Sequence, residues 1–479
     1  MSSEQHVTLK PRFTIGLNSS LYGGTCLVGE NKICYVAGRT VVISDLNSTT
    51  QTFVQQSRQP ISSIAICSKK RTLAFAEEES TSDGHRRRSR ITLYSVHSLR
   101  KITELYNDGG SGYSEEDNDG NIDKDNESEA QISLYCRKFV TTSFSNDGRI
   151  ILAMGPSQDS KALTLTCWNV HDSKIISYIP ALASWRGVKD AWCQGTFHTA
   201  DSSLLCASYR DKYWFYRVID SPSNNSEEAN NTLREVNNPL LFLSSDQNEF
   251  ALCHCWVQSD DRVIIGTSIG DLIVCHESEL KCRIQSGEDK VEYIVAISSG
   301  FVAGCSGASF QMYKDVGSTE CSIGQGNVYI CKARWSMESI TSNLMYERRL
   351  ITSISVSEDE STLWAMVSGT NQIHSFDLTT ITTTDNTTSS PYSHDIVNGH
   401  IGSINGLDTC IRKPALITVG SDHTARLWNY VNAKLILCQH FQEEPYSVSF
   451  HPSGLHALIG FADKLRLMKI LVDDMQHQW

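Results

Sequence analysis

The fold is decided by the stretch Leu416-Ile-Thr-Val-Gly-Ser-Asp-His-Thr-Ala-Arg-Leu-Trp428, which follows Gly399-His400. Two short apolar runs here flank a tight polar turn, an arrangement that predicts a β-hairpin. Four polar side chains can meet in one buried hydrogen-bond chain: His400, Thr418, Asp422 and Trp428. The carboxylate of Asp422 accepts, the rings of His400 and Trp428 donate N–H groups, and the hydroxyl of Thr418 can do both. A buried network with every member satisfied fixes one arrangement of the chain, so we interpret these residues as structural and not catalytic.

Units of the same kind recur along the chain. Apolar runs of four to six residues, rich in Val, Ile, Leu, Phe and Tyr, alternate with turns such as Phe144-Ser-Asn-Asp-Gly148 and Phe450-His-Pro-Ser-Gly454. Runs of this length predict strands, and no convincing amphipathic helix separates them, which favours antiparallel pairing and an all-β fold. With inserted loops set aside, the period is about 40–50 residues, which is the spacing of WD repeats with four strands in each β-propeller blade.

The number of units predicts two parts. We count nine blade-like units, centred near residues 35, 75, 155, 205, 265, 300, 360, 415 and 455. Closed propellers hold about 4–8 blades, so nine units overfill one ring. We therefore expect a first WD40-type propeller of about seven blades in residues 1–385 and about two blades of an incomplete second propeller in residues 386–479. The Thr- and Ser-rich segment Thr379–Ser390 is expected to link them, and the acidic segment Asn107–Glu129 is expected to be a disordered loop, as is Ser221–Asn238 in milder form.

Other units keep only parts of the signature. Trp168-Asn169 retains the end of the third strand, and Asp463 retains the acid of the turn, with Met468 where the tryptophan would stand. Degenerate blades still close when their apolar faces stack, so the all-β prediction does not depend on them.

The composition excludes several functions. A formal net charge of −12 over 479 residues provides no positive field to draw the chain onto nucleic acid. Residues 1–12 are polar, unlike a signal peptide, and no apolar run approaches the about 18 residues of a membrane-spanning helix. The sixteen cysteines lie mostly in apolar runs, which is typical of reduced, buried thiols. We expect a cytoplasmic or nuclear, reducing compartment and no membrane partner.

Three motifs suggest binding chemistry but lack what it needs. Arg86–Arg90 could be a nuclear-import or anion-binding patch, but acids precede it, which favours a solvated hairpin loop of mixed charge. Glu115–Asn126 approximates a calcium loop without the glutamate at its twelfth position. Cys253-His254-Cys255 resembles a metal site, but on a strand His254 points away from the two cysteines. With no catalytic glycine loop or nucleophile elbow either, we expect no catalytic residue, cofactor, metal or small-molecule substrate.

Several C-terminal segments lie well outside the generic WD consensus. They are Thr409–Pro414, Arg426–Tyr430, Gln442–Gly454 and Gly460–Met468, followed by Asp473-Asp474; a further segment, His254–Gly270, lies in the fifth unit. These segments resemble the cilia- and flagella-associated protein 57 family of WD-repeat axonemal proteins, most densely over Gly399–Asp474. The resemblance implies two tandem propellers and a long coiled coil, with no catalytic residues.

The same resemblance implies a scaffold of the motile ciliary or flagellar axoneme, cytoplasmic before assembly. Its implied partners are inner dynein arm or dynein regulatory complex components on the doublet microtubule. Because the chain ends at Trp479, two blades into the second ring, we expect those blades to be completed by another chain or to be poorly stable alone.

Two alternatives remain open. One is a general cytoplasmic WD-repeat adaptor, for instance in a ubiquitin ligase; receptors of that kind carry Arg two residues after the WD dipeptide, where this chain has Val431 and His171. The other is a propeller enzyme, which gathers acids or a metal at the central channel. No such cluster is evident in the sequence.

Overall fold

The structure, a computed structural model, describes part of the chain: residues 11–48, 50–54, 57, 59–82, 85–106, 136–185, 193–210, 212–219, 233–236, 249–257, 261–276, 279–287, 289–316, 329–337, 350–368, 372–383, 392–395, 399–400, 402–471 and 474–477. The expected acidic loop Asn107–Glu129, the calcium-like stretch Glu115–Asn126 and residues 221–232 lie outside these ranges.

Four-stranded antiparallel sheets follow one another along the chain, nine of them within the described residues, and we call each a blade. The first four blades comprise β1 (Thr25–Leu27), β2 (Lys32–Ala37), β3 (Thr40–Asp45) and β4 (Gln51–Phe53); β5 (Ile61–Cys67), β6 (Thr72–Glu77), β9 (Arg90–Ser95) and β10 (Lys101–Leu105); β11 (Thr141–Phe144), β12 (Ile150–Pro156), β13 (Ala162–Asn169) and β14 (Ile175–Ser184); and β15 (Cys193–Phe197), β16 (Leu204–Tyr209), β17 (Lys212–Val218) and β18 (Leu233–Glu235). A small hairpin, β7 (Ser80–Ser82) with β8 (His85–Arg87), projects between β6 and β9.

The next three blades repeat the pattern. They comprise β19 (Ala251–Trp256), β20 (Arg262–Thr267), β21 (Asp271–His276) and β22 (Glu279–Gln285); β23 (Val291–Ile297), β24 (Gly300–Cys305), β25 (Ser309–Asp315) and β26 (Tyr329–Ser336); and β27 (Ile351–Val356), β28 (Thr362–Val367), β29 (Gln372–Asp377) and β30 (Tyr392–Asp395). The last two blades comprise β31 (Ile404–Thr409), β32 (Ala415–Gly420), β33 (Thr424–Asn429) and β34 (Lys434–His440), and β35 (Ser447–Phe450), β36 (His456–Gly460), β37 (Leu465–Ile470) and β38 (Met475–His477). The prediction of an all-β propeller is confirmed.

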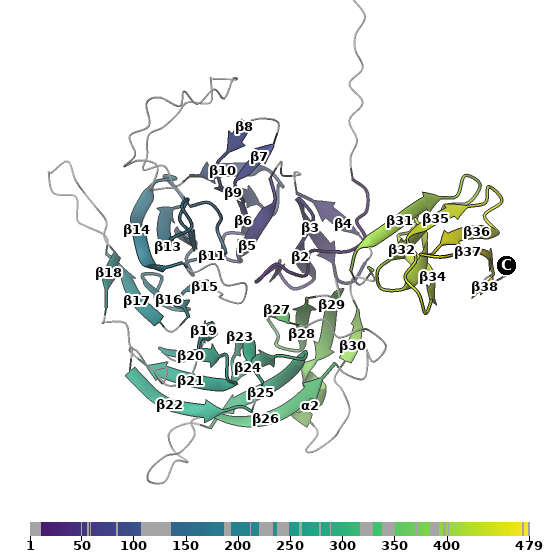
Figure 1. Cartoon of the computed structure of the whole chain (residues 1–479). Coiled ribbons are helices and arrows are strands. Elements are labelled where there is room, and N and C mark those ends of the chain that lie inside the picture. The colour runs from purple at the N-terminus through teal and green to yellow at the C-terminus, as the bar shows by residue number, and fades with distance from the viewer. Residues whose placement is uncertain are drawn as a thin grey trace, which may run out of the picture.

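Blades 1 to 7 close into a ring (Figure 1), with each first strand lying beside the first strand of the next blade and β27 beside β1. The closure does not exchange a strand, because each blade is built from its own consecutive segments. Instead, Thr25 donates a hydrogen bond to Ser353 Oγ (2.7 Å), and Gly23 N donates to Thr352 O (2.8 Å). Leu17, Tyr35, Trp364 and Ile373 share one buried core across the seam.

The burial of the strands explains why their sequences are runs of consecutive apolar residues. The middle strands are covered on both faces by neighbouring blades, so β6 and β24 are buried along their whole length. Outer strands have one solvated face and alternate, as β26 does. Blades 8 and 9 share a separate core that includes Ile417, Leu427 and Ile459; Figure 1 draws them beside the ring.

The segment expected to link the two parts differs from the expectation. Its first residues form the helix α2 (Leu378–Thr383), which Asp377 caps by accepting hydrogen bonds from Thr379 N (2.8 Å) and Thr379 Oγ1 (2.6 Å). Strand β30 then pairs with β29 beyond residue 385 and completes blade 7. Its residues, Tyr-Ser-His-Asp, contain no apolar run, and for that reason no strand was predicted there. No described helix is long and apolar enough to cross a membrane.

Candidate functional site

The best-defined polar constellation lies inside blade 8. His400 Nδ1 is 2.9 Å from Asp422 Oδ1, His400 Nε2 is 2.7 Å from Thr418 Oγ1, and Trp428 Nε1 donates to the same hydroxyl at 2.9 Å. All four side chains are buried. One protonation pattern satisfies them all: the Trp428 N–H donates to Thr418, the Thr418 O–H donates to His400 Nε2, and His400 Nδ1–H donates to the Asp422 carboxylate.

Two further side chains belong to this network, and the sequence reading missed both. Thr424 Oγ1 donates to Asp422 Oδ1 (2.7 Å), and Arg426 donates to Asp422 Oδ2 (3.3 Å) and to Thr424 Oγ1 (3.3 Å). Thr424, Arg426 and Trp428 alternate along β33 and so share one face of it. That spacing is the signal that could have revealed them. Because every polar group has an internal partner, the network holds the blade together and leaves no group free for chemistry.

The strand registers show why the other blades lack this network. In blade 8, Trp428 pairs with Leu416, two residues before Thr418. The position equivalent to Thr418 is apolar or aromatic in the other eight blades: Tyr35, Phe75, Ala153, Ala207, Ile265, Ala303, Ala365 and Ile459. In blade 3 the equivalent residue, Ala153, has no hydroxyl, and Trp168 donates instead to Tyr106 O (3.0 Å). Asp463 joins no buried network, since its side chain is 74 % exposed and lies 4.0 Å from Lys464 Nζ.

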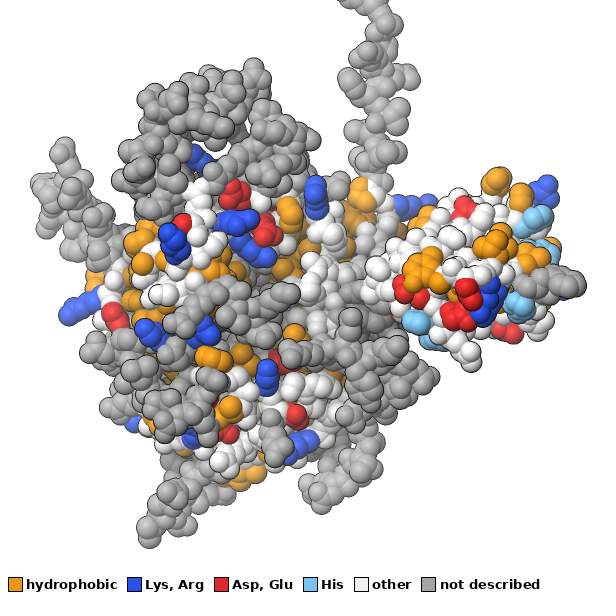
Figure 2. Space-filling model, in the orientation of Figure 1, with side chains coloured by type: hydrophobic (Ala, Val, Ile, Leu, Met, Phe, Trp, Pro, Cys, Tyr) orange, Lys and Arg blue, Asp and Glu red, His pale blue; other side chains and the backbone are white. Residues whose placement is uncertain are grey.

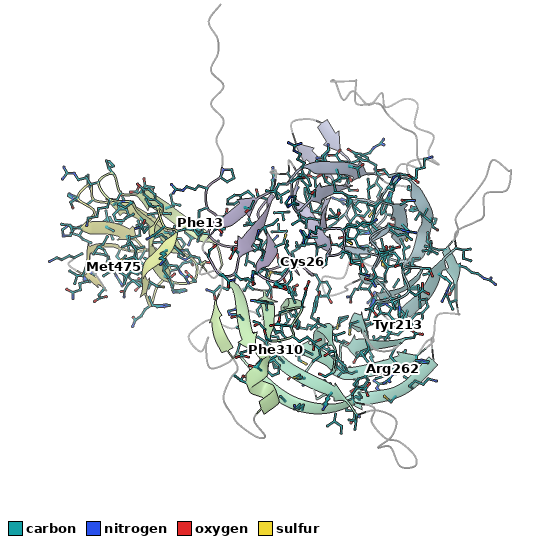
Figure 3. All side chains as sticks on the ribbon, turned by 180° about the vertical axis from the view of Figure 1, so that it is seen from behind. Phe13, Cys26, Tyr213, Arg262, Phe310 and Met475 are labelled. Atoms are coloured by element: carbon teal, nitrogen blue, oxygen red, sulfur yellow. The ribbon has the colours of Figure 1, made fainter. Side chains whose placement is uncertain are left out.

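The segment before β1 reaches across the inner wall of the ring. Tyr22, which is buried, donates its hydroxyl to Glu292 O on β23 (3.2 Å), and its ring lies 5.1 Å from that of Tyr293. Figure 3 shows Cys26, on the first strand of blade 1, near the centre of the ring. Since β23 belongs to blade 6, Tyr22 extends past blade 7 and occupies space at the inner wall.

Glu292 is the most unusual titratable group of this wall. One carboxylate oxygen accepts from Ile351 N (2.6 Å), and the other has no hydrogen-bond partner. Burial raises the pKa of Glu292 from 4.5 to about 7, although the bond from Ile351 N opposes the rise. A lone carboxyl of this kind can exchange a proton near neutral pH. Within the described residues, however, no group of three His, Cys, Asp or Glu side chains could hold a metal ion.

Cys253-His254-Cys255 lies on β19, and its side chains diverge. His254 faces blade 4, where its ring nitrogens lie 2.8 Å from Thr196 Oγ1 and 2.8 Å from Ser208 Oγ. Cys253 faces blade 6, with Sγ 3.5 Å from Val291 O. Burial lowers the pKa of His254 to about 3, so the ring is neutral and joins two blades.

Arg86–Arg90 is split between two elements. Arg86 and Arg87 lie in the strand β8 of the small hairpin, whereas Arg90 begins β9. Arg90 forms ion pairs with Glu77 and with Glu104, the latter at 3.2 Å. Arg90 is therefore neutralised by acids of its own blade.

One cavity, of about 510 Å³, lies between first-strand turns of blades 3 and 4 and is lined by Phe144, Asn146, Phe197, His198, Thr199 and Ala200. His198 Nδ1 accepts hydrogen bonds from Ala200 N and Asp201 N, and Nε2 lies 2.9 Å from Asp261 Oδ1. Asp261 belongs to blade 5, so this approach brings turns of blades 4 and 5 together, although His198 Nε2 makes no hydrogen bond there.

Comparison with known proteins finds similar proteins along most of the chain. No family model matches the chain. The chain is 24 % identical over 510 aligned residues, 96 % of its length, to cilia- and flagella-associated protein 57 of Mus musculus. It is 22 % identical over 99 % of its length to cilia- and flagella-associated protein 57 C of Tetrahymena thermophila, and 29 % identical over 47 % of its length to protein 57 A of that organism.

The chain spans about a third of the first two relatives, 36 % and 37 % of their lengths. A solved β-propeller domain, Cps50 (Swd1) of Myceliophteria thermophila, aligns with a TM-score of 0.48 and 11 % identity, covering 77 % of this chain and 96 % of that domain. The resemblance carried by the non-consensus segments is thus confirmed: the chain is similar along nearly its whole length, at 22–24 % identity, to proteins named cilia- and flagella-associated protein 57.

Proposed function

We propose that this chain is a non-catalytic WD-repeat scaffold of the motile ciliary or flagellar axoneme, which docks inner dynein arm or dynein regulatory complex components on doublet microtubules. The observation that carries the proposal is the similarity, along almost the whole chain, to proteins named for cilia and flagella. Because the chain spans about a third of those relatives, the partners are part of the proposal.

The build of the ring supports a scaffold. Stacked blades with fully buried middle strands form a rigid body, and the turns between strands present side chains at fixed positions. The polar groups of blade 8, which have the strongest motif, all bind one another. Catalysis would need a pair of reactive side chains with a position left free for a substrate. A role in binding other proteins therefore fits the blade 8 network better than a catalytic role does.

We also propose that blades 8 and 9, from β31 to β38, are two blades of a second propeller, which therefore begins after β30 and not at residue 386. Of the sixteen large hydrophobic side chains that are exposed in the described residues, eleven lie between Ile404 and Leu471. Some of them lie on the faces of blades 8 and 9 that are turned away from their shared core: Leu407 in blade 8, and Leu458 and Leu465 in blade 9. In the ring, a neighbouring blade covers the equivalent positions. Figure 2 shows hydrophobic side chains gathered on the surface of this unit.

Localisation tests the axonemal proposal. The chain is tagged in a motile-ciliated cell, axonemes are extracted with detergent and then with high salt, and each fraction is blotted. The tag alone, expressed at the same level, is the control. Retention of the tagged chain on the doublets through both extractions is expected. Its complete release with the membrane and matrix fraction would overturn stable docking and would favour a general cytoplasmic WD-repeat adaptor.

A further inference from the structure

One face of the ring carries the turns that join the first strand of each blade to the second and the third strand to the fourth. The turn from β5 to β6 in blade 2 is Ser68-Lys-Lys-Arg71, with all three cations exposed. The turn from β9 to β10 adds Arg100, and the corresponding turns of blade 3 add Arg149 and Lys174. We call Lys69, Lys70, Arg71, Arg100, Arg149 and Lys174 the basic turn patch.

Hydrogen bonds show that these turns form one continuous surface. Val96 N donates to Arg71 O (2.9 Å), which places the outer turn of blade 2 beside its inner turn. Val170 N donates to Arg149 O (2.8 Å) and does the same in blade 3. Lys70 Nζ donates to Gly148 O (2.9 Å), and the hydroxyls of Thr103 and Ser173 lie 2.8 Å apart, so both the inner and the outer parts of the two blades are joined. Figure 1 shows blades 2 and 3 side by side in the ring.

The patch keeps its positive charge. Among the described residues, the only ion pair of its cations joins Arg149 to Asp147 at 3.5 Å, and the other acid of these turns, Asp172, lies 2.5 Å from His171. Six cations therefore face two acids, in a chain whose formal charge is −12. A basic surface of that size on an acidic protein attracts an anionic partner and speeds its association.

The same face carries an acidic turn at blade 7, which blade 1 separates from blade 2. The turn from β27 to β28 in blade 7, which corresponds to Ser68–Arg71 of blade 2, contains Glu358, Asp359 and Glu360. Glu360 accepts a hydrogen bond from Ser298 Oγ (2.6 Å) in the equivalent turn of blade 6, so the turns of blades 6 and 7 also adjoin one another. A long, uniformly charged polyanion that lies across this face would meet these acids, whereas a short acidic segment fits the patch alone.

We propose that the basic turn patch docks an acidic peptide segment of a partner protein. Ile102, on the edge strand β10 next to Arg100, is 52 % exposed and supplies an apolar contact of the kind common at protein interfaces. No Phe, Tyr or Trp side chain lies in the four turns to stack on nucleic acid bases. The proposal stands apart from the axonemal one, because it concerns the purified chain and does not depend on where the chain resides.

Fluorescence anisotropy of a labelled oligo-glutamate peptide, titrated with the purified full chain, tests this proposal. Lys69→Glu/Arg71→Glu reverses two exposed charges of the patch and is expected to weaken binding about tenfold and to lessen its salt dependence. Arg412→Glu/Lys434→Glu makes the same change of charge on exposed residues of blade 8 and is expected to keep the affinity within about twofold. Equal melting temperatures of the three proteins show that the substitutions leave the fold intact.

Three results would overturn the proposal. The first is an equal loss of peptide affinity in the patch variant and the control variant, which would mean that only net charge matters. The second is binding of labelled oligothymidylate at least as tight as that of the peptide and sensitive to the patch variant, which would indicate nucleic acid. The third is patch-dependent binding to vesicles of anionic lipid with none to the peptide, which would indicate a membrane surface.

Discussion

Replacing Thr418 by Val removes the hydroxyl at the centre of the blade 8 network but keeps a β-branched side chain on the strand. Trp428 Nε1 and His400 Nε2, which lie 2.9 and 2.7 Å from that hydroxyl, both lose their partner in a buried region. Each unsatisfied buried group costs about 1–3 kcal/mol. Two such groups, partly offset by the burial of the added methyl group, give an expected loss of about 3 kcal/mol in the local free energy of unfolding.

Hydrogen exchange measures this loss where it arises. The ring and the C-terminal blades have separate cores, so a global melt need not be two-state. Mass spectrometry of peptides from β32 and β33 reports the opening of blade 8, and a loss of about 3 kcal/mol corresponds to about a hundredfold faster exchange. Thr409→Val, on the exposed side of the neighbouring strand β31, is the matched control and is expected to change stability by less than about 0.5 kcal/mol. Equal exchange in the two variants would refute the stabilising role of the hydrogen-bond chain.

Three further predictions concern the ring seam, the inner wall and the open blades. Trp364→Ala empties a core shared by blades 7 and 1 and is expected to cost about 3–5 kcal/mol, with faster exchange in both blades; faster exchange in blade 7 alone would contradict closure through this core. Since burial raises the pKa of Glu292 from 4.5 to about 7, the folded chain binds that proton more tightly, so the contribution of Glu292 to the free energy of unfolding is greatest below about pH 4.5 and falls by about 3 kcal/mol as the pH rises to 7. Glu292→Gln is expected to remove this fall in denaturant titrations across that range, and an unchanged slope would place the charged carboxylate in water. Leu458→Ser/Leu465→Ser is expected to reduce self-association in light scattering without lowering stability, because both side chains are exposed on the open face of blade 9; undiminished association would mean that this face takes no part.

The local pattern of apolar and polar residues was enough to predict most of the strands that form the blades. Apolar runs with polar turns predict strands because each middle strand is covered on both faces, and the structure has such strands throughout the ring. The residues of the blade 8 network follow from their spacing, and Thr424 and Arg426 would have followed from alternation along β33. Strand β30 escaped prediction because its pairing with β29 comes from the backbone, and its polar residues give no periodic signal.

What the sequence could not supply is the arrangement of blades around a closed ring. Tyr22 and Glu292 are 270 residues apart in the sequence and form a hydrogen bond, and the local sequence around either residue does not predict this contact. The charges of the turns show the same limit. Lys69–Arg71 and Glu358–Glu360 are plainly visible as a basic and an acidic turn, and each looks like an ordinary solvated loop when read alone. Only when the ring places equivalent turns on one face do the basic region of blades 2 and 3 and the acidic turn of blade 7, which blade 1 separates from blade 2, become parts of one surface. A partner that binds this face must therefore match an uneven charge distribution, so the ring geometry sets both the place and the orientation of an acidic segment.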